Sequence, residues 1–158
     1  LRAGLDHLLL ASALGETATT VLIGEGKRET SKKRDESDEA DPYPIERCVW
    51  RGIDRDTAHA RLATLLALWR DGQHAPLPFA PKTSFAYAEA LIKKEPQAAW
   101  ATARAAFDPY GDFGGDADDV WIALAFRPHG WFGAFDDTVA ERFRTVATQV
   151  FAATEPSE

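Results

Sequence analysis

The residue types that could do chemistry gather between Arg51 and Asp56, a stretch that reads Arg-Gly-Ile-Asp-Arg-Asp. Its two carboxylates, Asp54 and Asp56, stand close together beside basic residues. Carboxylate oxygens are suitable ligands for Mg²⁺, and water activated by such a metal attacks phosphodiesters. One hypothesis is therefore a metal-dependent nuclease in which Asp54 and Asp56 hold the metal.

Nucleases of the PD-(D/E)xK class place such an aspartate on a core strand. A following acid and a Lys two residues beyond it complete their site, and all these groups must meet at the metal. Here a predicted helix follows Asp54 at once, and no Asp/Glu-x-Lys strand comes after it. We therefore interpret Asp54 and Asp56 as helix-cap and first-turn residues. No catalytic residue is assigned.

Other candidate metal or cofactor sites fit the sequence poorly. The acids from Asp112 to Asp119 lack the fixed alternation and the final Glu of an EF-hand loop. The four histidines are scattered in the sequence, and none is separated from Cys48 by the residue spacing typical of metal-binding motifs. Cys48 itself lies in no nucleophile signature, which favours an ordinary strand cysteine. We predict no metal and no cofactor.

The charge balance limits the mode of DNA binding. The net charge is −7, whereas strong nucleic-acid binders usually carry a basic surplus. A basic run from Lys27 to Arg34 is followed directly by acids that neutralise it. Residues 25–42 are therefore expected to form an exposed charged loop. Any contact with DNA would use a local patch or depend on a larger assembly.

Length and composition favour one domain over residues 1–158, and the absence of Met suggests a fragment of a longer chain. The single Cys48 excludes an intrachain disulfide and fits a reducing cytoplasm. No apolar run is long enough to cross a bilayer, so no membrane association is expected.

The centre of the chain must position these residues, and it reads as two helices joined by a proline-rich turn. Asp56 is expected to cap the first helix and Gly72 to end it, and the turn covers residues 75–81. Thr83 or Ser84 is expected to cap the second helix, which ends at the two lysines 93 and 94. The predicted buried stripe of the first helix is formed by Leu62, Leu65, Leu66 and Trp69.

The remaining pattern predicts a helix-rich α/β (α+β) fold with a small sheet. Strands at 17–24 and 45–50 are expected to pair as an antiparallel hairpin, the first of them buried on at least one side. Helices are expected at 1–14, 97–107, from Asp116 to Pro128 and from about Asp137, with a frayed tail at 154–158. The expected buried residues are Leu1, Leu5, Leu8 and Leu9; Trp100, Ala103 and Phe107; Val120, Trp121, Leu124 and Ala125; and Val139, Phe143, Val146 and Val150.

The segment Leu68-Trp69-Arg70-Asp71-Gly72, followed by Pro76-Leu77-Pro78-Phe79-Ala80-Pro81-Lys82-Thr83-Ser84-Phe85-Ala86-Tyr87-Ala88, resembles the C-terminal domain family of RecC. The opening residues 1–10, the strand residues 20–24 and the Ala123-Leu124-Ala125-Phe126-Arg127 segment are similar to that family in the same order. RecC is the gamma subunit of exodeoxyribonuclease V, the RecBCD helicase–nuclease of bacteria.

This resemblance implies a PD-(D/E)xK nuclease-like fold that has lost its catalytic residues. The implied role is structural: to hold RecB-like and RecD-like subunits in a heterotrimer and to guide double-stranded DNA ends during unwinding, degradation and recombinational repair in the bacterial cytoplasm. Two alternatives stay open, an active metal-dependent nuclease and a helical interaction adaptor unrelated to DNA.

The resemblance also singles out residues. Those implied to define the fold are Trp69, Gly72, Pro76, Pro78, Phe79, Ser84, Tyr87 and Phe126. Lys82 and Arg127 are chemically suited to a phosphate or carboxylate. With Trp131 and Phe132, aromatics in a glycine-containing loop, they are the candidates for DNA or partner contact.

Overall fold

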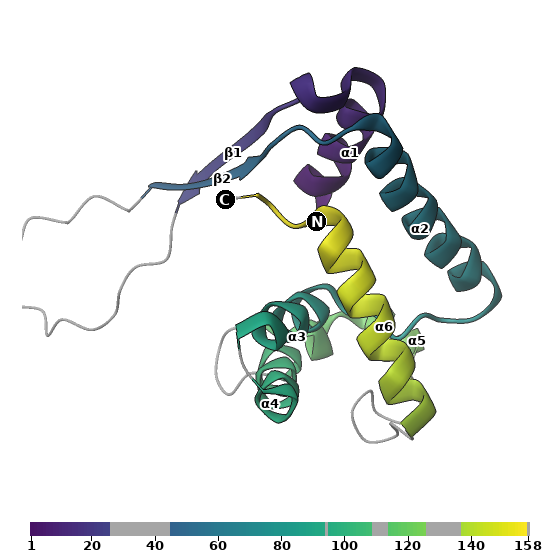
Figure 1. Cartoon of the computed structure of the whole chain (residues 1–158). Coiled ribbons are helices and arrows are strands. Elements are labelled where there is room, and N and C mark those ends of the chain that lie inside the picture. The colour runs from purple at the N-terminus through teal and green to yellow at the C-terminus, as the bar shows by residue number, and fades with distance from the viewer. Residues whose placement is uncertain (26–44, 94, 109–113, 126–136, 158) are drawn as a thin grey trace, which may run out of the picture.

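The computed structural model describes residues 1–25, 45–93, 95–108, 114–125 and 137–157. Within these ranges the chain is rich in helices and carries one small sheet (Figure 1). The elements are α1 (Arg2–Leu14), the 3₁₀ turn η1 (Gly15–Thr17), β1 (Thr20–Glu25), β2 (Ile45–Trp50), α2 (Arg55–His74), α3 (Pro81–Lys93), α4 (Pro96–Phe107), the 3₁₀ turn η2 (Asp116–Asp118), α5 (Val120–Ala125) and α6 (Asp137–Thr154).

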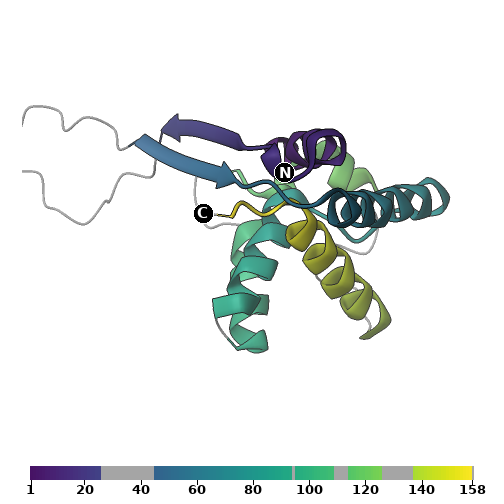
Figure 2. The ribbon, with the colours of Figure 1, turned by 45° about the horizontal axis from the view of Figure 1, so that its top comes forward.

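The two strands form the predicted antiparallel hairpin, in which Leu22 lies opposite Cys48 and Val21 opposite Val49. The hairpin projects away from the helices in both views (Figures 1 and 2). The expectation of a buried face on the first strand is wrong, because Val21, Leu22 and Ile23 are all exposed. Among the strand residues whose burial the structure describes, Trp50 at the base of the hairpin is the only buried one.

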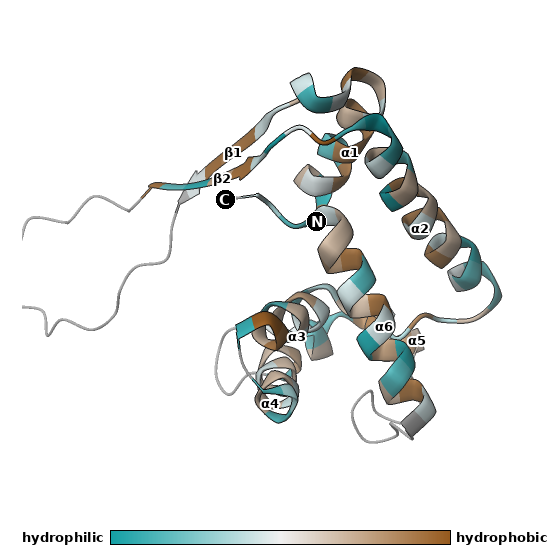
Figure 3. Ribbon diagram, viewed as in Figure 1, coloured by the Kyte–Doolittle hydropathy of each residue, from teal (hydrophilic) through white to brown (hydrophobic). Residues whose placement is uncertain are grey.

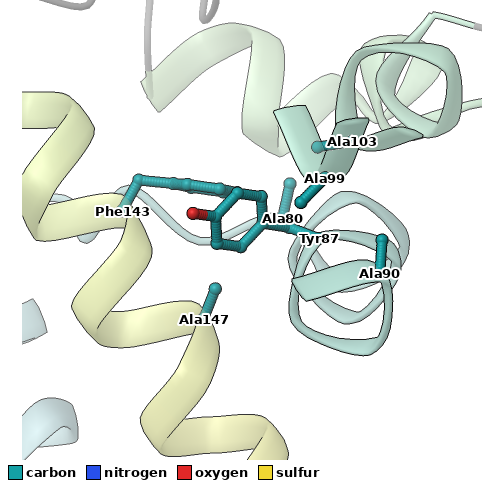
Figure 4. Packing of buried hydrophobic residues seen from close by; sticks show 7 residues of the cluster. All are labelled: Ala80, Tyr87, Ala90, Ala99, Ala103, Phe143 and Ala147. Atoms are coloured by element: carbon teal, nitrogen blue, oxygen red, sulfur yellow. The ribbon is translucent and has the colours of Figure 1, made fainter. Parts of the chain in front are cut away.

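The main core lies between α3, α4 and α6 (Figure 4). Tyr87 of α3 contacts Phe143 of α6 and Trp100 of α4, with ring centroids 5.4 Å and 5.1 Å apart. Small residues surround these rings, and they are Ala80, Ala90, Ala99, Ala103 and Ala147. Alanines let the helix backbones approach closely, so three aromatic rings fill the space between the three helices. The stripe predicted for 97–107 is confirmed here, with Ala103 buried and Trp100 and Phe107 packed against the cluster. In the last helix Phe143, Val146 and Val150 are buried as predicted, whereas Val139 is half-buried.

A second, smaller cluster joins α1 to α2 through Ala11, Ala18 and Ala58, with Ile53 packed against it. Helix α6 connects the two clusters, because it packs on α3 and also contacts α1 and α2. Figure 1 shows its C-terminal end beside the start of α1. The two helical groups are therefore held by one shared helix.

Three close contacts hold α1, β2 and the C-terminal end of α6 together. A side chain at Gly4 would overlap the carbonyl oxygen of Thr154, so α1 and the end of α6 touch through their backbones. The indole of Trp50 donates a hydrogen bond to that same carbonyl at 2.9 Å. The backbone N–H of Ser157, in the predicted tail, donates to the Val49 carbonyl at 2.7 Å.

The predicted helix ends differ from the observed ones at several places. The helix expected to begin at Asp116 is instead the short 3₁₀ turn η2, and α5 follows it from Val120. Gly72 lies inside α2, which continues to His74 and ends at Ala75. Helix α3 begins at Pro81, ahead of Thr83 and Ser84. Proline is favourable at the first helical position, because a backbone N–H there would have no acceptor within the helix. Lys94, the second expected terminal lysine, lies outside the described residues.

The predicted buried stripes of α1, α2 and α5 are wrong in part. In α1 the buried residues are Gly4, His7, Leu8 and Ala11, whereas Leu1, Leu5 and Leu9 are exposed. In α2, Leu66 and Trp69 are exposed, and Leu62 and Leu65 are half-buried. In α5, Val120, Trp121, Leu124 and Ala125 are exposed, and Ile122 is the residue that reaches the core.

Candidate functional site

The two acids of the Arg51–Asp56 stretch serve the start of α2. Asp54 is the N-cap residue: its Oδ1 accepts the backbone N–H of Thr57 at 2.8 Å, and its Oδ2 accepts the Thr57 hydroxyl at 2.7 Å. These two hydrogen bonds, that of the hydroxyl first, lower the pKa of the exposed Asp54 carboxyl below its ordinary value. Asp56 lies in the first turn, where an acid complements the helix dipole. The capping interpretation is confirmed for Asp54, whereas the expectation that Asp56 caps the helix is wrong, because Asp56 lies one residue inside α2.

Lys82, a candidate for DNA or partner contact, has an internal partner. Its Nζ donates a hydrogen bond to the carbonyl oxygen of Gly114 at 2.6 Å, although the side chain remains exposed. This bond ties the start of α3 to the segment that precedes η2. The other three contact candidates, Arg127, Trp131 and Phe132, lie outside the described residues.

The fold-signature residues divide between core and surface. Tyr87 and Pro78 are buried, Phe79 is half-buried, and Pro76 and Gly72 are exposed. The buried hydroxyl of Ser84 accepts the Ala80 N–H at 3.2 Å, at the entry to α3. Trp69 is 62% exposed, so it does not belong to the core. Phe126 lies outside the described residues.

Large apolar side chains instead collect on the surface. Twelve of them lie on one stripe of α1 and its N-cap residue (Leu1, Leu5, Leu9), on the hairpin (Val21, Leu22, Ile23, Ile45), on α2 (Leu66, Trp69) and on α5 (Val120, Trp121, Leu124). Figure 3 shows parts of the hairpin and of α1, α2 and α5 in the colours of hydrophobic residues. Exposed aromatic and aliphatic groups of this size are typical of protein–protein contacts. We refer to these twelve side chains as the apolar surface set.

The described ranges show neither a metal cluster nor a helix suited to cross a membrane. No three His, Cys, Asp or Glu side chains there come together closely enough to hold a metal ion. None of the helices in those ranges combines the length and hydropathy that a bilayer crossing requires.

Sequence reasoning missed the residues that fix the junction of α1, β2 and α6. His7 is buried, with its Nδ1 3.1 Å from the Thr20 hydroxyl and its Nε2 3.0 Å from the Arg51 carbonyl. A side chain at Gly52 would overlap the carbonyl oxygen of Glu16. The only signal in the sequence was a glycine within a helical pattern, Gly4, which often marks close packing.

Comparison with known proteins gives one family match. The family model described as the RecC C-terminal domain matches residues 1–92, which span α1, the hairpin, α2, the proline turn and nearly all of α3. No curated protein and no solved structure matches the chain. With more than half of its length covered by that family model, the chain belongs to the RecC C-terminal domain family.

Proposed function

We propose that this chain is a non-catalytic domain of a RecC-like gamma subunit of exodeoxyribonuclease V. It binds RecB-like and RecD-like subunits and guides double-stranded DNA ends that the assembly unwinds and degrades. Membership in the family indicates a role in the RecBCD complex and in DNA repair. The kinship with PD-(D/E)xK nucleases belongs to the same proposal and is supported by the family resemblance.

The observation that carries the proposal is the apolar surface set. Ile23 is 67% exposed, Trp121 76% and Val120 74%, values that leave most of each side chain in water. Burying a side chain of this size is worth about 1.5–3 kcal/mol, so leaving many exposed is unfavourable for an isolated chain. A partner surface that covers them recovers this free energy. Tryptophan is also among the residues that most often dominate binding energy at interfaces.

The non-catalytic part of the proposal is supported by the role of Asp54. Both of its carboxylate oxygens accept hydrogen bonds from Thr57 at the start of α2. Ligation of a metal would compete with this cap and would leave the Thr57 N–H without its acceptor. The capping role explains why an acid stands there.

Subunit binding is tested by co-expression of the chain with RecB-like and RecD-like subunits, followed by affinity purification. The variants Trp69→Ser and Trp121→Ser each remove one exposed indole and should reduce the recovery of partner subunits by tenfold or more. Gln149→Ser, an exposed polar position on α6, is the matched control and should leave recovery unchanged. Undiminished recovery with both tryptophan variants would refute the apolar surface set as the interface.

The absence of catalysis is tested separately, with linear DNA and Mg²⁺ or Mn²⁺. The chain and its Asp54→Ala variant should leave the DNA equally intact. Cleavage by the chain that disappears in Asp54→Ala would establish the nuclease alternative instead.

A further inference from the structure

One face of the β1–β2 hairpin is apolar and largely open to water. Side chains alternate between the two faces of a strand, and residues directly opposite each other in an antiparallel pair share a face. Val21 lies opposite Val49 and Ile23 opposite Arg47, so these four residues share one face. Ile45, two positions before Arg47 on β2, belongs to the same face and is 80% exposed. We refer to these five side chains as the hairpin face.

The rest of the described chain gives the hairpin little support. Both strands project from the helices (Figures 1 and 2), and α1 is the one described helix that makes more than marginal contact with a strand. The C-terminal segment joins the hairpin at its base, where the Ser157 N–H donates to the Val49 carbonyl. A two-stranded hairpin is at best marginally stable alone in water, so a surface that covers it would stabilise it.

A single cation stands at the centre of the hairpin face. Arg47 is exposed, lies opposite Ile23 and has Ile45 and Val49 as its neighbours on the same face of β2. In the part of the chain that the structure describes, its guanidinium group has no ion pair. A surface that buries the four apolar side chains also takes this guanidinium out of water, which is unfavourable unless a carboxylate meets it. The complementary surface is therefore apolar with an acid near its centre.

A second copy of this chain would not supply that surface. Two hairpin faces packed centre to centre would bring two Arg47 cations together, and each copy carries a net charge of −7. The acid that continues the row is Glu25, whose register opposite Ile45 places it at one end of the face. An acid that meets Arg47 at the centre is therefore expected from a different protein.

The dimensions of the hairpin face match one α-helix. Adjacent strands lie about 4.8 Å apart, so two strands with their side chains are roughly as wide as the ~10 Å of a helix. The strand from Ile45 to Val49 rises about 14 Å, which is the length of about nine helical residues. A second sheet would extend beyond both strands and leave part of its own apolar face uncovered.

We propose that the hairpin face binds an amphipathic helix of another protein, whose apolar stripe carries one Asp or Glu that pairs with Arg47. This inference deepens the proposed function and rests on it in one respect, the assignment of the helix to a RecB-like or RecD-like subunit. The hairpin face differs from the rest of the apolar surface set because Arg47 adds recognition of a charge to apolar burial.

The test is co-expression of the chain of 158 residues with RecB-like and RecD-like subunits, followed by affinity purification. Ile23→Ser should reduce the recovery of a partner subunit by about tenfold or more, because a large apolar contact is lost. The matched control is Ile92→Ser. Ile92 lies on α3, outside the apolar surface set, and is 69% exposed, much as Ile23 is. Its replacement should leave recovery unchanged.

Arg47→Leu tests for the acid on the partner. The change enlarges the apolar face, yet it leaves a covered carboxylate without its cation, so recovery should fall by about tenfold or more. A wholly apolar partner surface would instead retain Arg47→Leu as well as the unaltered chain or better, and that result overturns the proposal. Arg142→Leu makes the same charge change at an exposed position on α6 and should leave recovery unchanged. Equal losses from the two arginine variants would also overturn the proposal.

Circular dichroism verifies that each variant is folded, and Ile45→Ser replaces Ile23→Ser if that variant unfolds. Sedimentation velocity of the chain without partners tests for a second copy, and the chain should sediment as a monomer. A dimer that Ile23→Ser dissociates would make a second copy the occupant of the hairpin face and would overturn the proposal.

Failure of this inference differs from failure of the proposed function. If Trp69→Ser and Trp121→Ser reduce the recovery of partner subunits and the hairpin variants do not, the inference alone is overturned. If the unaltered chain recovers neither subunit, the proposed function is refuted and the inference fails with it.

Discussion

The carboxylate of Asp116 accepts the backbone N–H of Thr83 at 2.7 Å, although the two residues stand 33 positions apart in the chain. Thr83 lies in the first turn of α3, where backbone N–H groups have no partner within the helix. Asp116 thus caps α3 from a different segment. Lys82 bonds to the Gly114 carbonyl beside it, so two adjacent residues of α3 hold this segment.

Replacement of Asp116 by Ala should lower the free energy of unfolding by about 1–3 kcal/mol, because a buried N–H loses its acceptor. Asp116→Asn should cost less, since an amide oxygen still accepts this hydrogen bond. Urea denaturation measures both changes. Asp71→Ala removes an exposed acid from α2 and should stay within about 0.5 kcal/mol. Equal losses from Asp116→Ala and Asp71→Ala would contradict a capping role.

A side chain at Gly4 should also be destabilising, in spite of the higher helix propensity of alanine. The new methyl group would overlap the carbonyl and Cβ of Thr154, and the backbone there cannot turn aside as a flexible side chain could. Overpacking of this kind costs about 1–3 kcal/mol, more than the roughly 1 kcal/mol that Gly→Ala gains inside a helix. Thermal unfolding of Gly4→Ala should therefore begin at a lower temperature than that of the unaltered chain.

The control for Gly4 is Gly24→Ala in β1. A Cβ at Gly24 would meet no atom within 4 Å, so the melting temperature should change little. A stabilised Gly4→Ala variant would mean that α1 does not press against the end of α6.

The hairpin and the last helix were predictable because their signals are local. Alternating and β-branched residues mark both strands, and a charged run separates them, which favours an antiparallel pair. In the last helix, the predicted apolar stripe is Val139, Phe143, Val146 and Val150, of which all but the half-buried Val139 are buried. There the apolar residues of the pattern and the residues facing the core are the same.

The leucines of α1 illustrate why such a pattern can mislead. Leu1, Leu5 and Leu9 repeat at helical spacing, yet α1 buries the face that carries Gly4, His7 and Leu8. A small glycine permits the close crossing with α6, and this geometry outweighs the area of the leucines. Periodicity shows that a helix has an apolar face. It does not show whether that face packs against the same chain or can be covered by another chain. The hydrogen bond from the Thr83 N–H to Asp116 was not predicted for a related reason, because the acceptor lies on a segment distant in the sequence.

Tyr87 should make stability depend on alkaline pH. Burial raises the pKa of its phenol above the ordinary value of 10.0, and the cation of Arg144 opposes this only in part. Because the folded state favours the neutral phenol, its contribution is complete below pH 10 and is lost as the pH rises through the higher pKa of the folded state. The free energy of unfolding should therefore fall with pH above about 10.

Tyr87→Phe isolates this effect, because phenylalanine keeps the contacts of the ring with Phe143 and Trp100 but cannot ionise. Urea denaturation at neutral pH and above pH 10 should show a smaller alkaline loss for the variant than for the unaltered chain. Every other ionisable group is present in both proteins, so the comparison isolates the Tyr87 phenol. Identical pH profiles would mean that the Tyr87 phenol is as well solvated in the folded state as in the unfolded one.

Truncation of Trp69 should cost much less stability than truncation of Phe143, although the sequence predicts both as core residues. Trp69 is 62% exposed, so Trp69→Ala should lower the free energy of unfolding by less than about 1 kcal/mol. Phe143 is fully buried among Tyr87, Trp100 and the surrounding alanines, and Phe143→Ala should cost about 3–5 kcal/mol through lost burial and a cavity.

Urea denaturation of the chain without partners measures both values. A loss of 3 kcal/mol or more at Trp69 would place that indole in the core and would remove it from the apolar surface set. If the loss stays small while Trp69→Ser still reduces recovery of partner subunits, the indole acts in binding and not in folding. That combination distinguishes an interface residue from a core residue, because only the former changes association without changing the stability of the isolated chain.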